Sequence, residues 1–252
     1  MNKLARKGLA LIFWGYFLLL TFIITLPVSW WILASQNFAY SSLHDAIGIG
    51  EHIARYAPRN RFQKKDFELT SRAERTELFH GVVEAIQNHG EGLDRLFYID
   101  AQKRLIPLFT EAEITHLQDV ANLLDKLKPL VFAAFILWLI SVFFIGWKKI
   151  QIPSLKQWLT ITSVLVLLVA GLLLLGPEKI FNQLHIWVFP KNHQWFFYYE
   201  DSLMSTMMKA PDLFAYIAAM WALLSMVLTA ILIGILKYTP PTFYTFSHKT
   251  AQ

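Results

Sequence analysis

The sequence contains no cysteine and few charged residues. Without cysteine, the chain forms no disulfide, binds no metal through a thiolate and uses no thiol nucleophile. Charged residues make up 16% of its 252 residues, whereas they make up about 25% of soluble domains. Hydrophobic residues make up 55%. So much apolar surface does not fit into a soluble core of this size. The composition therefore indicates a lipid-facing protein and excludes a disordered chain.

Four segments lack every charged residue and every histidine, and each is long enough to cross a bilayer as a helix. A soluble helix of such length would carry a polar stripe, and none of the four does. The first segment is predicted to be an uncleaved anchor, because its apolar run exceeds the roughly 7–15 residues of a signal peptide. The predicted fold is an all-α membrane protein with four transmembrane helices at residues 8–34, 129–147, 158–175 and 213–236.

The charges are divided unequally among the segments between these helices. Residues 1–7, 148–157 and 237–252 together hold eight basic residues and no acidic residue. The segments 35–128 and 176–212 hold all 18 acidic residues. The positive-inside rule therefore predicts that both termini and the 148–157 loop are cytoplasmic, and that the 35–128 domain and the 176–212 segment face outward. Because the excess positive charge is split among three short segments next to helices, it does not indicate nucleic-acid binding.

The 35–128 segment is predicted to be a mainly helical extracytoplasmic domain without a sustained strand pattern. Ser71–Glu74 and Thr110–Glu113 are capping-box patterns, and each begins a helix with an apolar face. A basic cluster precedes the first of these helices, and it fits either a solvated surface loop or a contact with anionic lipid headgroups. The cluster consists of Arg59, Arg61, Lys64 and Lys65.

His116 lies on the second of these helices, with Glu113 and Asp119 three positions to either side. Residues three apart share a helix face, so the pattern places carboxylates beside an imidazole, an arrangement that suits a general base. An ordinary charged surface face has the same pattern. The spacing of Glu113 and His116 also occurs in di-metal carboxylate bundles, which need further ligands from other helices. The spacing alone leaves these alternatives open.

The 176–212 segment concentrates aromatic residues outside any predicted span. They surround His185 and His193, and this composition favours an interfacial or re-entrant element at the outer headgroup level. An aromatic belt without chemistry fits the composition equally well. The aromatic residues are Phe181, Trp187, Phe189, Trp195, Phe196, Phe197, Tyr198 and Tyr199.

Two motifs resemble those of a known family. Residues 108–120 resemble its pattern of phenylalanine, an acidic stretch and His-Leu-x-Asp-Val, with His116 and Asp119 at the matching positions. The 176–212 segment is similar to its aromatic-rich pattern at Phe181, His185, Phe189, Pro190, Trp195, Phe197, Asp201, Ser202, Leu203 and Pro211. The family consists of four-span integral membrane proteins and includes the bacterial lipoprotein intramolecular transacylase, Lit.

The resemblance implies an acyltransferase of the bacterial cytoplasmic membrane, with its active site on the outer face. Lit-like enzymes move the sn-2 acyl chain of a diacylglyceryl-modified lipoprotein onto the amine of its own N-terminal cysteine, which gives a lyso-form lipoprotein. The implied partners are thus a diacylated lipoprotein and membrane lipid. The resemblance implies neither a metal nor an organic cofactor.

The same resemblance implies that His116 and His185 are the catalytic pair. His116, oriented by Asp119 or Glu113, is expected to act as general base, and His185 as proton donor or oxyanion stabiliser; the reverse assignment stays open. Two further groups are implied, namely Glu113, Asp119 and Asp201 in support of the site and Phe189, Trp195 and Phe197 in an acyl-chain pocket.

The sequence leaves alternatives to this interpretation. His193 departs from the family's pattern and could compete with His185 for its role. A non-catalytic membrane protein, whose outer domain binds lipid or a partner protein, is the alternative function. A metal site that uses Glu113 and His116 is a third hypothesis.

Overall fold

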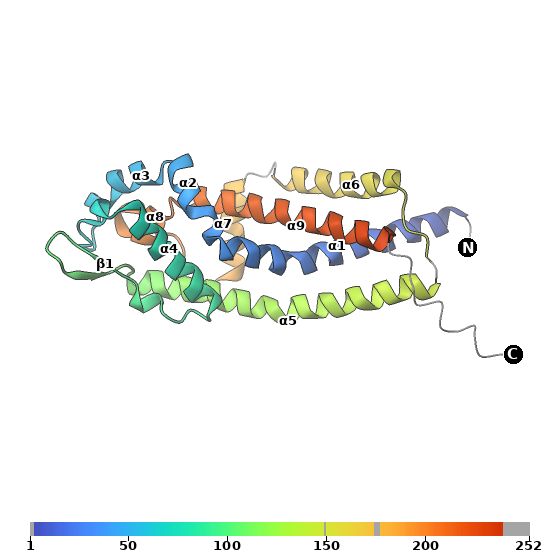
Figure 1. The fold of residues 1–252 in the computed structure, drawn as a ribbon, viewed down its shortest axis with the longest axis horizontal. Coiled ribbons are helices and arrows are strands. Elements are labelled where there is room, and N and C mark those ends of the chain that lie inside the picture. The colour runs from blue at the N-terminus through green and yellow to red at the C-terminus, as the bar shows by residue number, and fades with distance from the viewer. Residues whose placement is uncertain (1–2, 149, 174–176, 239–252) are drawn as a thin grey trace. The chain divides into compact units, whose positions relative to one another are not determined.

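Helices dominate the computed structural model, which describes residues 3–148, 150–173 and 177–238 (Figure 1). The elements in chain order are α1 (Lys3–Ser35), η1 (Asn37–Ala39), α2 (Tyr40–Ala46), α3 (Ile49–Tyr56), η2 (Ala57–Arg59), η3 (Phe67–Leu69), α4 (Arg72–Gln87), η4 (Leu93–Arg95), β1 (Phe97–Ile99), β2 (Leu105–Pro107), α5 (Glu111–Lys148), α6 (Leu155–Leu173), α7 (Pro177–Val188), η5 (Tyr199–Asp201), α8 (Leu203–Met207) and α9 (Asp212–Tyr238).

The chain divides into two compact units. The first, called the helical unit, comprises residues 1–29, 129–180 and 222–252. The second, called the site unit, comprises residues 30–128 and 181–221. The helical unit therefore contains most of the predicted spans, and the site unit contains most of the two segments that were predicted to face outward.

Three helices in the described part of the chain are long and apolar enough to cross a membrane, namely Gly8–Ser35, α5 and α9. The fourth predicted span, 158–175, falls on α6, which is not among these three. Residues 174 and 175 of that span lie outside the described residues, as do residues 1–2 and 239–252 of the two predicted cytoplasmic termini.

Helix α5 is continuous through Pro129, where the sequence predicted the junction between the outer domain and a span. Residues 111–128 carry charges and belong to the site unit, whereas residues 129–147 are charge-free and belong to the helical unit. Proline removes one backbone hydrogen bond, which long membrane helices tolerate when neighbouring groups compensate. One continuous helix therefore carries both a candidate site residue and an apolar span.

Hydroxyl groups join helices within the helical unit. Ser29 Oγ of α1 and Ser225 Oγ of α9 are 2.5 Å apart, and Thr25 Oγ1 lies 3.1 Å from Thr229 Oγ1. Trp138 Nε1 of α5 donates to Thr21 Oγ1 of α1 over 3.0 Å. Small hydroxyl side chains allow helix backbones to approach closely and satisfy one another where lipid offers no partner. This hydroxyl ladder, Thr21, Thr25, Ser29, Ser225 and Thr229, is buried.

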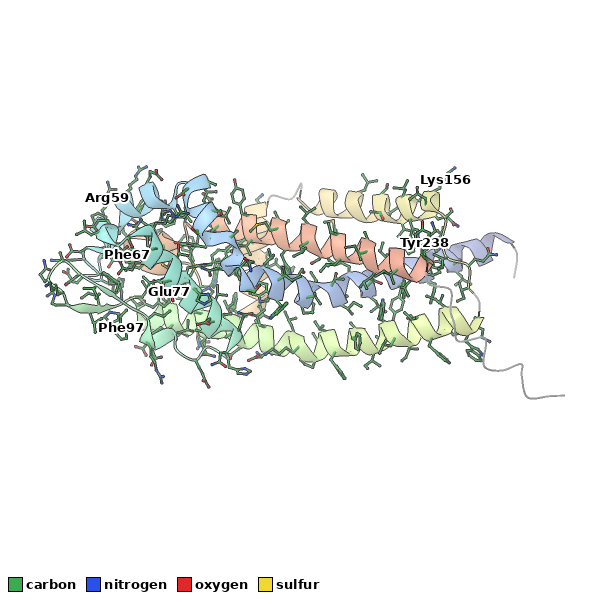
Figure 2. The ribbon with its side chains drawn as sticks, viewed as in Figure 1. Arg59, Phe67, Glu77, Phe97, Lys156 and Tyr238 are labelled. Carbon is green, nitrogen blue, oxygen red and sulfur yellow. The ribbon has the colours of Figure 1, made fainter. Side chains whose placement is uncertain are left out.

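The site unit has its own hydrophobic core. Helix α4 begins with the predicted capping box, because Ser71 Oγ accepts from Glu74 N while Glu74 Oε2 accepts from Ser71 N. Its apolar face is buried as predicted. Phe67, labelled in Figure 2, is fully buried and contacts Tyr98 edge-on, with ring centroids 5.1 Å apart. Other fully buried residues of this core are Tyr40, Ile49, Ile53, Leu108 and Leu203.

A short β-hairpin, which the sequence did not predict, interrupts the helical pattern of the site unit. Strands β1 and β2 are antiparallel, with Tyr98 opposite Ile106. Asp100 holds the turn, because its carboxylate accepts from Gln102 N, Arg104 N and Arg104 Nε. Strands of three residues are too short to show sustained alternation, so the sequence pattern did not reveal this hairpin in the mainly helical domain.

Candidate active site

His116 lies in the first turns of α5, within the site unit. Thr110 precedes the helix and caps it, because Thr110 Oγ1 accepts from Glu113 N over 3.4 Å. In return, Thr110 N and Thr110 Oγ1 both donate to Glu113 Oε2, over 2.6 and 2.7 Å. The side chain of His116 is 9% exposed. Its Nδ1 is buried and has no hydrogen-bond partner among the residues that the structure describes. Buried polar atoms without a partner are rare in folded proteins, so this nitrogen marks a candidate contact for a ligand.

His185 lies in the last turn of α7 and faces His116. The two ring centroids are 6.2 Å apart, and the rings are inclined by 30°. His185 Nδ1 is 2.8 Å from the carbonyl oxygen of Phe181, which can only accept. Nδ1 therefore carries a proton, and in the neutral ring Nε2 presents a lone pair. The structure thus brings the two predicted catalytic histidines next to each other.

Aromatic rings surround the two histidines. Phe189 contacts both, with ring centroids 5.1 Å from that of His116 and 5.2 Å from that of His185. The ring centroid of Trp195 lies 4.8 Å from that of His185, and the ring centroid of Phe197 lies 6.0 Å from that of His116. All three residues of the predicted pocket thus adjoin the histidine pair. Phe181, at 4.0 Å from the His185 ring, is a further member of this shell.

Burial keeps both imidazoles neutral. Burial, together with a smaller effect of the nearby His185, lowers the pKa of His116 to about 4, whereas the Asp119 carboxylate opposes the change. Burial also lowers the pKa of His185, while the hydrogen bond to the Phe181 carbonyl raises it. Desolvation disfavours the charged form of each ring. At neutral pH the site therefore offers two uncharged imidazoles in an apolar surrounding.

Glu113 supports the site in a different way from the one that the sequence suggested. Its carboxylate is fully buried, and Oε1 accepts from Ser202 Oγ over 2.6 Å and from Met204 N over 3.0 Å. Its other oxygen accepts from Thr110. In the described part of the chain Glu113 makes no hydrogen bond to His116. It ties the start of α8 to the start of α5 instead.

Asp119 also does not hydrogen-bond His116 in the described structure. Its Oδ2 is 2.7 Å from Nδ1 of His193, and this pair is largely shielded from solvent. The sequence raised His193 only as a competitor of His185. Nothing local indicated this pairing, because 74 positions separate the two residues.

Asp201 pairs with a cation from the 35–128 segment. Arg61 Nη2 donates to Asp201 Oδ2 over 2.8 Å, and Arg61 Nε lies 2.7 Å from Oδ1. Next to this ion pair, Arg61 N donates a hydrogen bond to the carbonyl oxygen of Glu200 over 2.8 Å. No hydrogen bond joins Asp201 to a histidine among the described residues. Asp201 therefore joins these two segments through its ion pair with Arg61.

Lys64 is a buried residue that the sequence placed in a surface cluster. It is 6% exposed, and its Nζ donates to the carbonyl oxygen of Pro107 over 2.5 Å. Burial lowers the pKa of Lys64, and the negative charge of Glu113 opposes this change. A buried lysine beside a buried carboxylate needs tertiary contacts that a local pattern does not reveal.

The donor atoms near His116 do not form a metal centre. No group of three or more His, Asp or Glu side chains that could hold a metal occurs among the described residues. Both Glu113 oxygens already accept hydrogen bonds from Thr110, Ser202 and Met204. The residues present therefore do not fit the metal hypothesis.

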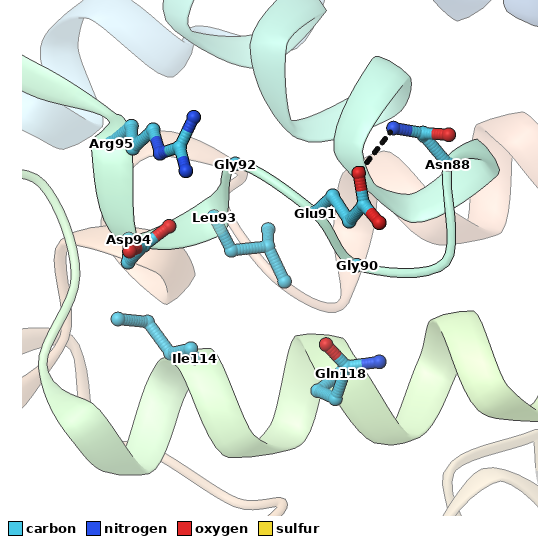
Figure 3. Close-up of a pocket in the computed structure, with 9 residues that line it drawn as sticks. All are labelled: Asn88, Gly90, Glu91, Gly92, Leu93, Asp94, Arg95, Ile114 and Gln118. Carbon is cyan, nitrogen blue, oxygen red and sulfur yellow. Dashed lines mark hydrogen bonds between the residues drawn. The ribbon is translucent and has the colours of Figure 1, made fainter.

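A separate cavity of about 480 Å³ lies beside α5 without either histidine of the pair. Figure 3 shows Ile114 and Gln118 pointing from α5 toward the 88–95 loop that forms its other wall. Each is two positions from His116, which corresponds to the opposite side of a helix. This cavity is therefore not part of the histidine site.

Comparisons with known proteins agree on one family. The family model described as lipoprotein intramolecular transacylase Lit matches residues 9–210. Three solved structures of Lit from Bacillus cereus have similar folds. A histidine-to-arginine variant is 15% identical, with a TM-score of 0.60, and 93% of this chain and 92% of that chain are covered. A histidine-to-alanine variant is 16% identical, with a TM-score of 0.59 and coverages of 94% and 96%. A third Lit structure is 15% identical, with a TM-score of 0.58 and coverages of 93% and 95%. Among curated proteins, no sequence matches the chain.

Proposed function

This chain belongs to the lipoprotein intramolecular transacylase family, and from that premise we propose the reaction that it catalyses. The protein moves the sn-2 acyl chain of a diacylglyceryl-modified lipoprotein onto the α-amine of that lipoprotein's own N-terminal cysteine. The product is an N-acylated lyso-form lipoprotein. The observation that carries the proposal is the meeting of two distant histidines in one aromatic shell, with a buried Nδ1 of His116 left without a partner in the described structure.

The proposed reaction is an ester-to-amide transfer within one substrate molecule. The amine lone pair attacks the ester carbonyl, the bond from that carbon to the sn-2 glyceryl oxygen breaks, and an amide forms. The proton lost by nitrogen ends on the glyceryl oxygen, so the balance requires neither water nor a redox partner. Because amine and ester belong to one molecule, holding them in reach supplies much of the rate. The protein has to move one proton and stabilise one oxyanion.

His185 is assigned as the proton carrier. Its Nδ1–H is engaged by the Phe181 carbonyl, so Nε2 is free to accept the proton of the attacking amine and to deliver it to the leaving oxygen. That carbonyl also raises the pKa of His185, which suits a base.

His116 is assigned as a neutral hydrogen-bond donor. A pKa of about 4 makes it a weak base for an ammonium whose pKa is roughly 7.7–8.0. A neutral imidazole still donates an N–H, and in a dry site such a donor stabilises a developing oxyanion. The partnerless Nδ1 is the atom that we place against the ester oxygen.

Phe189, Trp195 and Phe197 are proposed to line the acyl-chain pocket. Their rings adjoin the histidine pair, and they exclude water from the reacting ester while accepting an apolar chain. Exclusion of water also protects the ester from hydrolysis.

We propose a four-span arrangement in the bacterial cytoplasmic membrane, with α6 as the span that joins α1, α5 and α9. The domain order is a cytoplasmic arm, a span, the outer 35–128 domain, two spans joined by the 148–157 loop, the outer 176–212 segment, a last span and a cytoplasmic tail. The division of charge supports this orientation, because all 18 acidic residues lie in the two outer segments. The histidine site then lies at the outer face.

The test uses the purified chain with a synthetic lipopeptide that carries an N-terminal diacylglyceryl cysteine. Because substrate and product have equal mass, tandem fragmentation must assign the acyl chain to ester or amide. Wild type is expected to convert ester to amide, and His116→Ala and His185→Ala are each expected to lose about 100-fold or more. His80→Ala removes a partly exposed histidine of α4 and serves as the control. If wild type leaves both acyl chains on the glyceryl group, the alternative of a non-catalytic binding protein replaces this proposal.

A further inference from the structure

The segment between α7 and η5 passes over the histidine pair. This strap, residues 189–198, is neither helix nor strand, yet three of its rings contact the pair. His193 lies near its middle, with Phe189 on one side and Trp195 on the other. A hydrogen bond from His193 N to Pro190 O, 3.0 Å long, closes a turn that presents the imidazole.

His193 anchors the strap to the helix that carries His116. Its Nδ1 is 2.7 Å from Asp119 Oδ2, and because a carboxylate only accepts, Nδ1 carries the proton. The Asp119 side chain is 12% exposed and that of His193 is 32% exposed. Hydrogen bonds to an ionised group are shorter and stronger than neutral ones, and partial burial reduces their screening by solvent.

Asp119 interacts with two histidines, His193 by a hydrogen bond and His116 through its charge. It follows His116 by about one turn of α5, and its charge acts on His116 against the effect of burial. The groups that act on His116 are His185 from α7 and Asp119 from α5, and His193 of the strap faces Asp119. His193 therefore hydrogen-bonds the carboxylate whose charge affects the pKa of His116. The same hydrogen bond attaches the strap to α5.

We propose that His193 is a positioning residue of the transacylase site. Through Asp119 it holds the strap so that Phe189 and Trp195 stay against His116 and His185, and it keeps the Asp119 carboxylate directed away from the His116 ring. This inference rests on the proposed function, and it adds a residue that the catalytic pair alone does not include.

Four variants distinguish the loss of the His193–Asp119 hydrogen bond from a loss of the folded structure. His193→Ala removes the donor, whereas His193→Asn keeps an N–H near the position of Nδ1. Asp119→Asn removes the charge from the other partner. His89→Ala is the matched control, because His89 makes the same Nδ1-to-Oδ2 contact of 2.7 Å with Asp125 on the same helix, away from the pair.

The rate of acyl transfer to the lipopeptide amine is measured first, together with thermal unfolding. We expect His193→Ala to lower the turnover rate about tenfold or more, as loss of a charged hydrogen bond predicts, and His193→Asn to stay within about threefold of wild type. His89→Ala is expected to match wild type. The effects of His193→Ala and Asp119→Asn are expected to be less than additive in the double variant.

The titration of His116, followed by NMR of labelled histidines, gives a readout that a purely structural role would not move. His193→Ala is expected to raise the pKa of His116, because Asp119 is then no longer engaged, and Asp119→Asn is expected to lower it. An active wild type with His193→Ala equal to His89→Ala overturns the inference. So does an inactive His193→Asn, or a His116 titration that no variant moves. An inactive wild type overturns the proposed function and this inference together.

Discussion

At the scale of single residues, the two histidines differ in what their nitrogens can do. The Phe181 carbonyl holds one proton of His185 in place, whereas Nδ1 of His116 faces no partner in the described part of the chain. Both rings are neutral for the same reason, burial in an apolar shell, but His116 is buried more deeply. The two environments thus support the two proposed roles, a proton carrier for His185 and a hydrogen-bond donor to the oxyanion for His116.

The lowered pKa of His185 predicts the pH dependence of turnover. As pH falls through that pKa, Nε2 gains a proton and no longer accepts one, so the rate falls more steeply with pH. The substrate amine alone already makes the rate fall below its pKa of roughly 8. We expect the plot of log turnover rate against pH to steepen at a value below about 6.5, the ordinary pKa of histidine. Steepening above that value would contradict a lowered pKa for the base.

Glu113 is predicted to be a structural clamp of the site. Glu113→Gln replaces one acceptor oxygen by an amide that faces donors, so either Thr110 or the start of α8 loses its partner. A buried donor without a partner costs about 1–3 kcal/mol. We expect a lower midpoint in thermal unfolding, and Glu111→Gln, an exposed change on the same turn, is the control. Equal midpoints for the two variants would exclude the clamp.

At the scale of elements, the parts that the sequence predicted are those encoded locally. The capping box of α4 and the apolar face after it lie within one stretch of chain, and both are confirmed. The β1–β2 hairpin was missed because its strands have three residues each. The capping pattern at Thr110 likewise predicted the start of α5.

The contacts of the supporting carboxylates could not be predicted in the same way. The family motifs predicted that His116 and His185 belong to one site, and in the structure their ring centroids are 6.2 Å apart. The spacing of Glu113 and Asp119 on α5 suggested that both face His116. Tertiary contacts with Ser202 and His193, both remote in sequence, direct these carboxylates elsewhere. A pattern of positions on one helix does not show which partner a side chain finds across the core.

The hydroxyl ladder between α1 and α9 is predicted to stabilise the helical unit. Ser29→Ala removes the contact with Ser225, and hydrogen bonds between membrane helices contribute about 0.6 kcal/mol on average. We expect a small decrease of the thermal unfolding midpoint in detergent, and a less than additive effect with Ser225→Ala. Thr160→Val changes an exposed hydroxyl of α6 that bonds only to its own helix, and it is the control. A decrease no larger than that of the control would contradict the ladder.

At the scale of the whole molecule, the absence of cysteine makes the proposed orientation directly testable. Single variants Glu91→Cys in the outer domain and Lys156→Cys at the start of α6 each introduce one thiol into a chain with none. In intact cells whose outer barrier has been removed, a membrane-impermeant maleimide is expected to label the first and not the second. Labelling of the second alone would reverse the orientation, and labelling of both would contradict the four-span arrangement.

The central claim is that the histidine pair moves an acyl chain within one lipoprotein molecule. The most direct measurement mixes two diacyl lipopeptides that differ in both peptide sequence and acyl-chain length, and then identifies the acyl chain on each N-terminal amine by tandem mass spectrometry. The account predicts that each product carries the acyl chain of its own glyceryl group, and that the His116→Ala, His185→Ala double variant forms none. Products that carry the other peptide's acyl chain, or equal conversion by the double variant, would contradict it.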